Sequence, residues 1–142
     1  MIKEIINRDK IIAIIIKSQF NQDGINFFTP PEDSLQIAYM KRPINYEILP
    51  HLHKPVLREV NYTKEVLYIK SGKVRIDFYD DDKEYIESHI LQSGDVILLS
   101  YGAHGFFMLE ETEIIEVKQG PYAGESDKVR FDSIDINSIN VI

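Results

Sequence analysis

Three of the four histidines in this chain of 142 residues fall in a pattern that could bind a metal ion. His51 and His53 are two positions apart, and in a β-strand residues at this spacing point to the same face. Their Cα atoms would lie roughly 6.5 Å apart. Both imidazoles could then reach one ion, because a Zn–N bond is about 2.0–2.1 Å long. His104 lies much further along the chain, so such a site needs strands from distant parts of the sequence.

The strands that would position these histidines are short and are separated by turns. Residues 11–16 are all apolar and mostly β-branched, which favours a buried strand over a helix. Residues 73–79 alternate, with Val74, Ile76 and Phe78 on one face. Short strands at roughly 8–12-residue spacing predict an antiparallel β-sandwich or barrel. We expect strands over residues 11–16, 26–28, 35–41, 46–53, 65–70, 73–79, 85–91, 96–99, 104–109 and 113–118.

The composition narrows the classes of partner. The chain is 44% hydrophobic, and its 16 Lys and Arg against 23 Asp and Glu give a net charge of −7. This balance argues against nucleic-acid binding, which needs a basic surface, and against binding to an anionic membrane. An anionic small molecule is compatible with a locally basic pocket. The chain has no cysteine, which excludes disulfides and thiolate ligands and fits a reducing compartment.

The length predicts one domain over residues 1–142, with its core at about residues 35–118. The tail, residues 120–142, is rich in Gly, Pro, Asp, Ser and Asn, and we expect it to pack on the barrel or on a partner subunit. The chain shows neither a signal-peptide pattern nor an apolar run of about 18 residues, so we expect a cytoplasmic protein. Small β-sandwiches often pair through edge strands, which predicts a homodimer.

The histidines and the glycines around them resemble the two sequence motifs of the cupin superfamily. Residues 51–53 match the His-x-His start of the first motif, and residues 65–72 match its end, a Glu and a Gly separated by six residues. Residues 94–104 resemble the second motif, although Ser100 stands where the family has proline. The resemblance covers residues 46–118, and the gap between the two halves of the first motif is longer than in the family.

This resemblance implies a jelly roll (a double-stranded β-helix), in which two antiparallel sheets close around a cavity. It also implies a divalent metal ion held by His51, His53, Glu65 and His104. Three imidazoles and one carboxylate suit Fe, Mn, Zn, Ni or Co, and in an octahedral sphere two positions remain for water or substrate. Glu59 lies closer in sequence to the histidine pair and remains an alternative carboxylate ligand.

Other residues are candidates for substrate binding. Lys54 and Arg58 follow the histidine pair in a loop and could bind an anionic group such as a phosphate, a carboxylate or a sugar nucleotide. Phe106 and Met108 share the strand parity of His104 and would give the cavity an apolar wall. Tyr101, beside the turn before His104, is a further candidate contact, and His89, which fits no motif, we interpret as a surface residue.

Three functional classes follow. The chain resembles the small single-domain cupins of surface-polysaccharide and sugar-nucleotide pathways, which implies an isomerase or epimerase of a carbohydrate substrate. The metal would polarise a carbonyl or hydroxyl group as a Lewis acid, and Glu59 is a candidate base. The alternatives are an Fe(II)-dependent dioxygenase and a non-enzymatic module that binds a metal or a sugar. The fold alone does not choose among these classes.

Overall fold

The structure, a computed structural model, describes all 142 residues, and they fall into two compact units. The first unit consists of Met1–Phe20 together with Tyr62–Ile142, and the second of Asn21–Asn61. None of the helical turns in the structure is long and apolar enough to cross a membrane. The histidines singled out by their spacing are divided between the units, because His51 and His53 belong to the second and His104 to the first.

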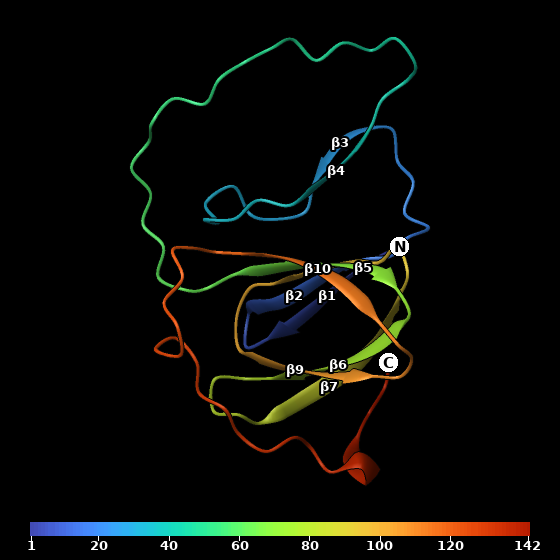
Figure 1. Cartoon of the computed structure of the whole chain (residues 1–142), viewed down its shortest axis with the longest axis vertical. Coiled ribbons are helices and arrows are strands. Elements are labelled where there is room, and N and C mark those ends of the chain that lie inside the picture. Colours follow the sequence, from blue (N-terminus) through green and yellow to red (C-terminus); the bar gives the residue numbers. More distant parts are fainter. The chain divides into compact units, whose positions relative to one another are not determined.

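The first unit is built from antiparallel β-strands, which confirms the predicted all-β class. A five-stranded sheet has the order β1-β2-β8-β5-β10, and a three-stranded sheet has the order β7-β6-β9. The two sheets face each other, with the C-terminal tail running beside the smaller one (Figure 1). The strands are β1 (Ile2–Asn7), β2 (Lys10–Ile16), β5 (Glu65–Ser71), β6 (Lys73–Tyr79), β7 (Tyr85–Gln92), β8 (Val96–Leu99), β9 (Ala103–Met108) and β10 (Glu113–Lys118), and a 3₁₀ turn, η1, covers Ile136–Ser138.

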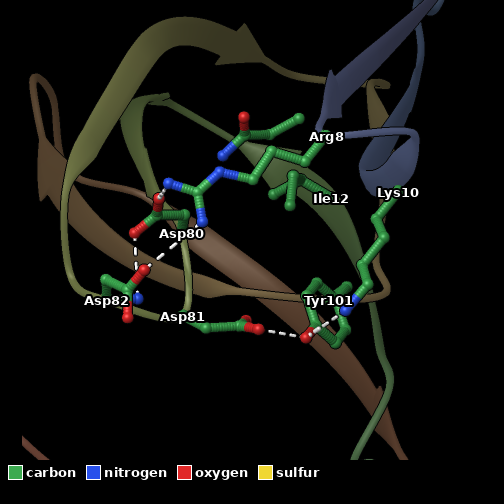
Figure 2. A pocket seen from close by; sticks show the side chains of 8 residues that line it. Arg8, Lys10, Ile12, Asp80, Asp81, Asp82 and Tyr101 are labelled. Carbon is green, nitrogen blue, oxygen red and sulfur yellow. Dashed lines mark hydrogen bonds and ion pairs between the residues drawn. The ribbon is translucent and has the colours of Figure 1, made fainter.

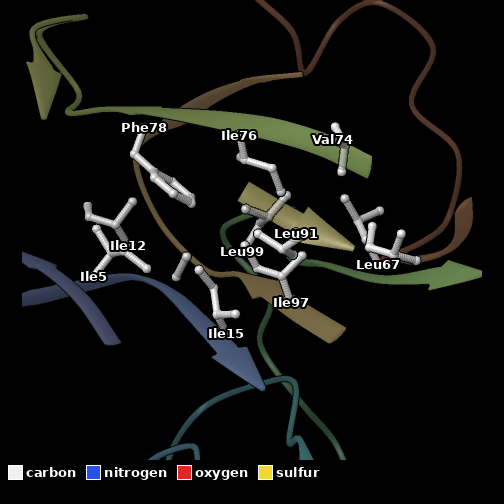
Figure 3. Packing of buried hydrophobic residues seen from close by; sticks show 12 residues of the cluster. Ile5, Ile12, Ile15, Leu67, Val74, Ile76, Phe78, Leu91, Ile97 and Leu99 are labelled. Carbon is white, nitrogen blue, oxygen red and sulfur yellow. The ribbon is translucent and has the colours of Figure 1, made fainter. Parts of the chain in front are cut away.

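The hydrophobic core lies between these two sheets. The strand predicted over residues 73–79 is confirmed as β6, although Asp77 and Tyr79 on its other face are buried as well. Val74, Ile76 and Phe78 of its predicted apolar face are fully buried. They pack against residues of the larger sheet, among them Ile15 and Ile97 (Figure 3). Burying one such side chain contributes about 1.5–3 kcal/mol, so the core fixes which face of every strand points inward. The residues of the hydrophobic core are Ile5, Ile12, Ala13, Ile15, Leu67, Ile69, Val74, Ile76, Phe78, Leu91, Ile97 and Leu99.

The turn between β5 and β6 depends on Gly72, the last residue of the first cupin-like motif. Its φ angle is +82°, in the left-handed region that L-residues with a side chain rarely adopt. A Cβ atom at this position would also collide with the backbone carbonyl oxygen of Glu111. The glycine of the motif therefore has a structural role in this chain.

The C-terminal tail is anchored along the three-stranded sheet. Val141 forms a parallel bridge with Ser88 of β7, and the amide of Ile134 donates a 3.1 Å hydrogen bond to the hydroxyl of Tyr79. The ring of Phe131 stacks edge-on against Tyr79 at 5.1 Å between centroids. The tail therefore adds backbone pairing to the free edge of β7 within the same chain.

The second unit contains one antiparallel hairpin, β3 (Gly24–Phe27) and β4 (Ala38–Lys41). The loop between them is held by side chains, because the amide of Gln36 donates to the carbonyl oxygens of Pro30 and Asp33 at 2.8 and 2.9 Å. The hydroxyl of Thr29 also bonds to Gln36 at 2.9 Å. These local bonds close the hairpin before position 38, so β4 is shorter than the predicted strand over residues 35–41.

The predicted strand over residues 46–53 is wrong. The chain after β4 has no regular structure up to residue 64. Pro43, Pro50 and Pro55 each remove a backbone N–H donor, and residues 42–63 are exposed in the structure. Without a neighbouring strand to pair with, the alternation of apolar residues there is not sufficient to form a strand.

The hydrophobic core predicts a clear contrast between two isoleucines. Ile97 on β8 is fully buried and Ile6 on β1 is 54% exposed. We expect Ile97→Ala to lower the free energy of unfolding by about 2–5 kcal/mol, because it leaves a cavity between the sheets. Ile6→Ala should change it by less than about 0.5 kcal/mol. Urea denaturation of both variants measures this, and equal losses would contradict the assignment of the core.

Candidate functional site

Glu65 and His104 are brought together between the two sheets of the first unit. Glu65 begins β5 and has the parity of Leu67, which is buried in the core. His104 on β9 stands opposite Phe78, another core residue. Both side chains therefore point inward, and Nε2 of His104 lies 3.3 Å from Oε2 of Glu65. Two of the four metal ligands predicted from the sequence thus meet, from facing sheets.

A lysine that the sequence analysis did not single out completes this cluster. Lys118 stands directly opposite Glu65 in the β10–β5 pairing, with Nζ 3.1 Å from Oε1 of Glu65. The same ammonium lies 2.6 Å from Oε1 of Glu116. The signal available in the sequence was parity, because Glu116 and Lys118 alternate in step with Ile114, which packs against the core.

The charges in this cluster stabilise one another. The hydrogen bond from His104, together with the Lys118 ammonium, lowers the pKa of Glu65 from 4.5 to about 2 and outweighs the opposing effect of burial. The pKa of Lys118 is raised, first by its hydrogen bond to Glu116 and then by Glu65. The carboxylate of Glu65 is therefore ionised at neutral pH while lying only 8% exposed.

An apolar edge borders the cluster on β9. Phe106 and Met108 lie on the same face of the strand as His104, because they stand opposite the core residues Ile76 and Val74. The ring of Phe106 lies 5.2 Å from that of His104, centroid to centroid. Phe106 is 39% and Met108 48% exposed. Phe106 and Met108 thus place partly exposed apolar surface beside the polar cluster. Their predicted role as the wall of a cavity stays a prediction.

The donor atoms of Glu65 and His104 fit two adjacent positions around one metal ion. With bonds of about 2.1 Å, neighbouring ligands of an octahedral ion lie about 3.0 Å apart, which is close to the observed 3.3 Å between Oε2 and Nε2. Within neither unit do three or more His, Cys, Asp or Glu side chains converge in a manner suited to a metal ion. In the first unit, Glu65 and His104 are the predicted ligands that lie together, and binding of a metal ion by them stays a prediction.

The other predicted ligands, His51 and His53, lie in the second unit. Their rings are neighbours, edge-on with centroids 5.2 Å apart, and Nδ1 of His51 lies 3.0 Å from the carbonyl oxygen of Leu49. The strand geometry expected for this pair is wrong, but the two imidazoles remain close together on irregular backbone. Their membership of a four-ligand site with Glu65 and His104 stays a prediction.

The predicted substrate loop belongs to the same irregular stretch. Lys54, Arg58 and Glu59 are exposed, and Glu59 accepts a 3.3 Å hydrogen bond from the side-chain amide of Asn61. Within the second unit no other side-chain hydrogen bond or ion pair involves these three groups. Their predicted roles, anion binding by Lys54 and Arg58 and base or ligand by Glu59, stay predictions.

Tyr101 lines a separate hollow of about 150 Å³ in the first unit (Figure 2). Its hydroxyl bonds to Asp81 and receives a 2.5 Å hydrogen bond from Lys10, whose ammonium lies 3.9 Å from the centre of the ring. Arg8 bridges Asp80 and Asp82 at 3.6 and 3.4 Å. These paired charges tie the β1–β2 turn to the β6–β7 turn. Tyr101 therefore has structural partners, and its substrate contact stays a prediction.

The interpretation of His89 as a surface residue is wrong. His89 on β7 stands opposite the core residue Ile76 and is only 5% exposed. Its Nε2 lies 2.8 Å from Oε1 of Glu87, and its ring lies 6.1 Å from that of Phe78. The position before a turn suggested exposure, whereas the alternation with buried Leu91 two residues later determines the face.

Comparison with protein-family models, with curated proteins and with solved structures gives no match for this chain. The resemblance to the cupins therefore rests on the sequence motifs and stays a prediction.

The pKa of Glu65 predicts how stability depends on pH. Its folded-state pKa is depressed, so the stabilisation is fully present above about pH 4.5 and is lost as the pH falls towards about 2. We expect the free energy of unfolding of the wild type to fall more steeply across this window than that of Glu65→Gln. Urea denaturation at several pH values measures the difference.

Glu113→Gln is the matched control, because Glu113 pairs with Lys70 on the same two strands at 2.9 Å but is exposed. Water screens such a pair, so this variant should keep the pH dependence of the wild type. An equal loss of pH dependence in both variants would refute the special role of Glu65.

Proposed function

We propose that this chain is a cupin-type protein that binds a divalent metal ion through Glu65 and His104. We further propose that it acts on a small carbohydrate or sugar-nucleotide substrate as an isomerase or epimerase. The observation that carries the proposal is the meeting of these two side chains between facing sheets, with donor atoms 3.3 Å apart. Both residues are the ones that the cupin-like motifs assign to the metal.

The jelly-roll architecture is part of the same proposal. Two antiparallel sheets that face each other over one apolar core are the layers that a jelly roll requires. The second cupin-like motif ends at His104 on β9, and the first ends at the β5–β6 turn. The second half of the first motif and the end of the second motif therefore lie on strands that border the proposed site.

A bound divalent ion would supply Lewis-acid chemistry, polarising a carbonyl or hydroxyl group of the substrate. Glu65 contributes a carboxylate that is ionised at neutral pH, and His104 contributes an imidazole nitrogen. His51 and His53 are the remaining ligands that the motif predicts. Glu59 is the alternative carboxylate.

The chain's own side chains suit a small polar substrate. Phe106 and Met108 present apolar surface next to His104 and would exclude water from one side of a sugar ring. Glu116 is 45% exposed and faces the same side of β10 as Lys118. It is a second candidate, beside Glu59, for holding a proton during isomerisation. Lys54 and Arg58 are the predicted anchors for an anionic group.

Metal content tests the proposal directly. We expect the wild type, purified without chelator or supplemented with divalent ions, to hold one ion per chain by elemental analysis. Glu65→Gln and His104→Ala should each lower the affinity on the order of 100-fold, since loss of a ligand costs at least as much as loss of a group behind it. His89→Gln removes the other His–Glu pair and should leave the metal content unchanged. Wild-type protein that holds no ion after supplementation would refute the metal site.

The same measurement decides the remaining assignments. If His51→Ala and His53→Ala also lower the metal content, the four-ligand set holds. If they do not, these histidines are not ligands. Iron accompanied by O₂ uptake on candidate substrates would favour the dioxygenase class over the isomerase. Metal binding without turnover of any sugar nucleotide would favour a binding module.

We also propose that the chain forms a homodimer through β10. This strand is the outer strand of the five-stranded sheet and carries Ile115 and Val117, which are 53% and 57% exposed. An edge with unpaired backbone groups and exposed apolar side chains favours pairing with another strand. Light scattering should give twice the chain mass of 16.5 kDa, and Val117→Lys should shift the particle towards one chain. A wild-type monomer would contradict this assignment.

A further inference from the structure

The ammonium of Lys118 lies in the cluster where the two proposed metal ligands, Glu65 and His104, meet. One carboxylate oxygen of Glu65 lies 3.3 Å from His104 Nε2, and the other lies 3.1 Å from Lys118 Nζ. Both oxygens are therefore engaged. Lys118 lies on β10 and Glu65 on β5, directly opposite each other. The strand pairing itself thus keeps the ammonium within reach of the carboxylate.

In this arrangement the Lys118 ammonium and a divalent metal ion would compete for the carboxylate of Glu65. An ion bound to Oε2 of Glu65 would stand a few ångströms from the ammonium, and like charges at that distance in a partly buried site repel each other. Lys118 is only 27% exposed at its side chain, so water screens the repulsion incompletely. Binding of the ion and pairing of Lys118 with Glu65 therefore oppose each other.

The structure also supplies an alternative acceptor for the displaced ammonium. Glu116 Oε1 lies 2.6 Å from Lys118 Nζ, and its side chain is 45% exposed. A small movement of the lysine away from Glu65 would keep this second pairing intact. The exchange then costs one ion pair and leaves no unpaired buried charge.

We propose that Lys118 is a built-in competitor for the metal ion at Glu65, and that loading of the site transfers its ammonium from Glu65 to Glu116. This inference rests on the proposed metal site. The competition lowers the affinity for every cation at Glu65.

The test is the affinity of variants for Mn²⁺, Co²⁺ and Zn²⁺ by calorimetric titration. We expect Lys118→Met to bind these ions about tenfold more tightly than the wild type, because the competing charge is gone. Lys118→Arg keeps the charge and should bind no more tightly than the wild type. Lys70→Met is the matched control, since Lys70 pairs with Glu113 across the same two strands at 2.9 Å with no histidine in the pair. It should leave the affinity unchanged.

A second variant, expected to weaken ion binding, keeps the test valid if Lys118→Met does not fold. Glu116→Gln removes the alternative acceptor and should weaken ion binding several-fold. In the Lys118→Met background the same substitution should have a much smaller effect, because Glu116 acts through the lysine. An equal effect of Glu116→Gln in both backgrounds overturns the proposed transfer to Glu116.

The outcomes separate this inference from the function on which it rests. Ion binding by the wild type with equal or weaker binding by Lys118→Met overturns the competitor role and leaves the metal site standing. Binding by Lys118→Met alone would mean that the lysine blocks the ion completely, and this overturns both the metal site of the wild type and the proposed transfer of the ammonium to Glu116. The absence of binding by both proteins overturns the competitor role and the metal site together.

Discussion

The packing of two sheets over one apolar core is the constraint on which the site depends. Inward positions of β5 and β6 are set by Leu67, Ile76 and their neighbours, each of which must leave water, and pairing with β6 sets those of β9. A shift of one residue in β5 or β6 would turn its apolar set outward. Glu65 and His104 share the inward parity of their strands, so the core that stabilises the fold also fixes the distance between them.

A buried charged side chain is stable in this fold where hydrogen bonds or ion pairs satisfy its charged atoms. Asp95, fully buried in the β7–β8 turn, accepts hydrogen bonds from the amides of Ser18 and Gln92 and from the ammonium of Lys17. Fixed backbone donors make that a structural carboxylate. Glu65 is satisfied only by side chains, His104 and Lys118, which can move. This difference in partners separates a carboxylate that holds a turn from one that could exchange its ligands.

Many strands of the first unit could be predicted from the sequence, because the hydrophobic pattern that identifies each strand lies within that strand. The alternation of residues 73–79 and the apolar run at residues 11–16 each identify a strand without knowledge of its neighbours. The pairing of Glu65 with Lys118 depends on which strands are adjacent in space, and no local pattern contains that information. The error over residues 46–53 has the same origin, since a strand needs a partner. The surface assignment of His89 is wrong because the side chain's face is set by its alternation with buried Leu91 and not by the nearby turn.

The composition of β2 has a consequence for the folding of the newly made chain. Its residues 11–16 comprise five isoleucines and one alanine, and in the native sheet the strand is protected between β1 and β8. Such a segment, uncharged and β-branched, is the kind that nucleates amyloid when its edges are free. The roughly 80 residues from Ile16 to Val96 take a ribosome about 4–16 s to add. For that interval β1 alone can pair with β2, so one edge of this apolar strand stays open until β8 has been made.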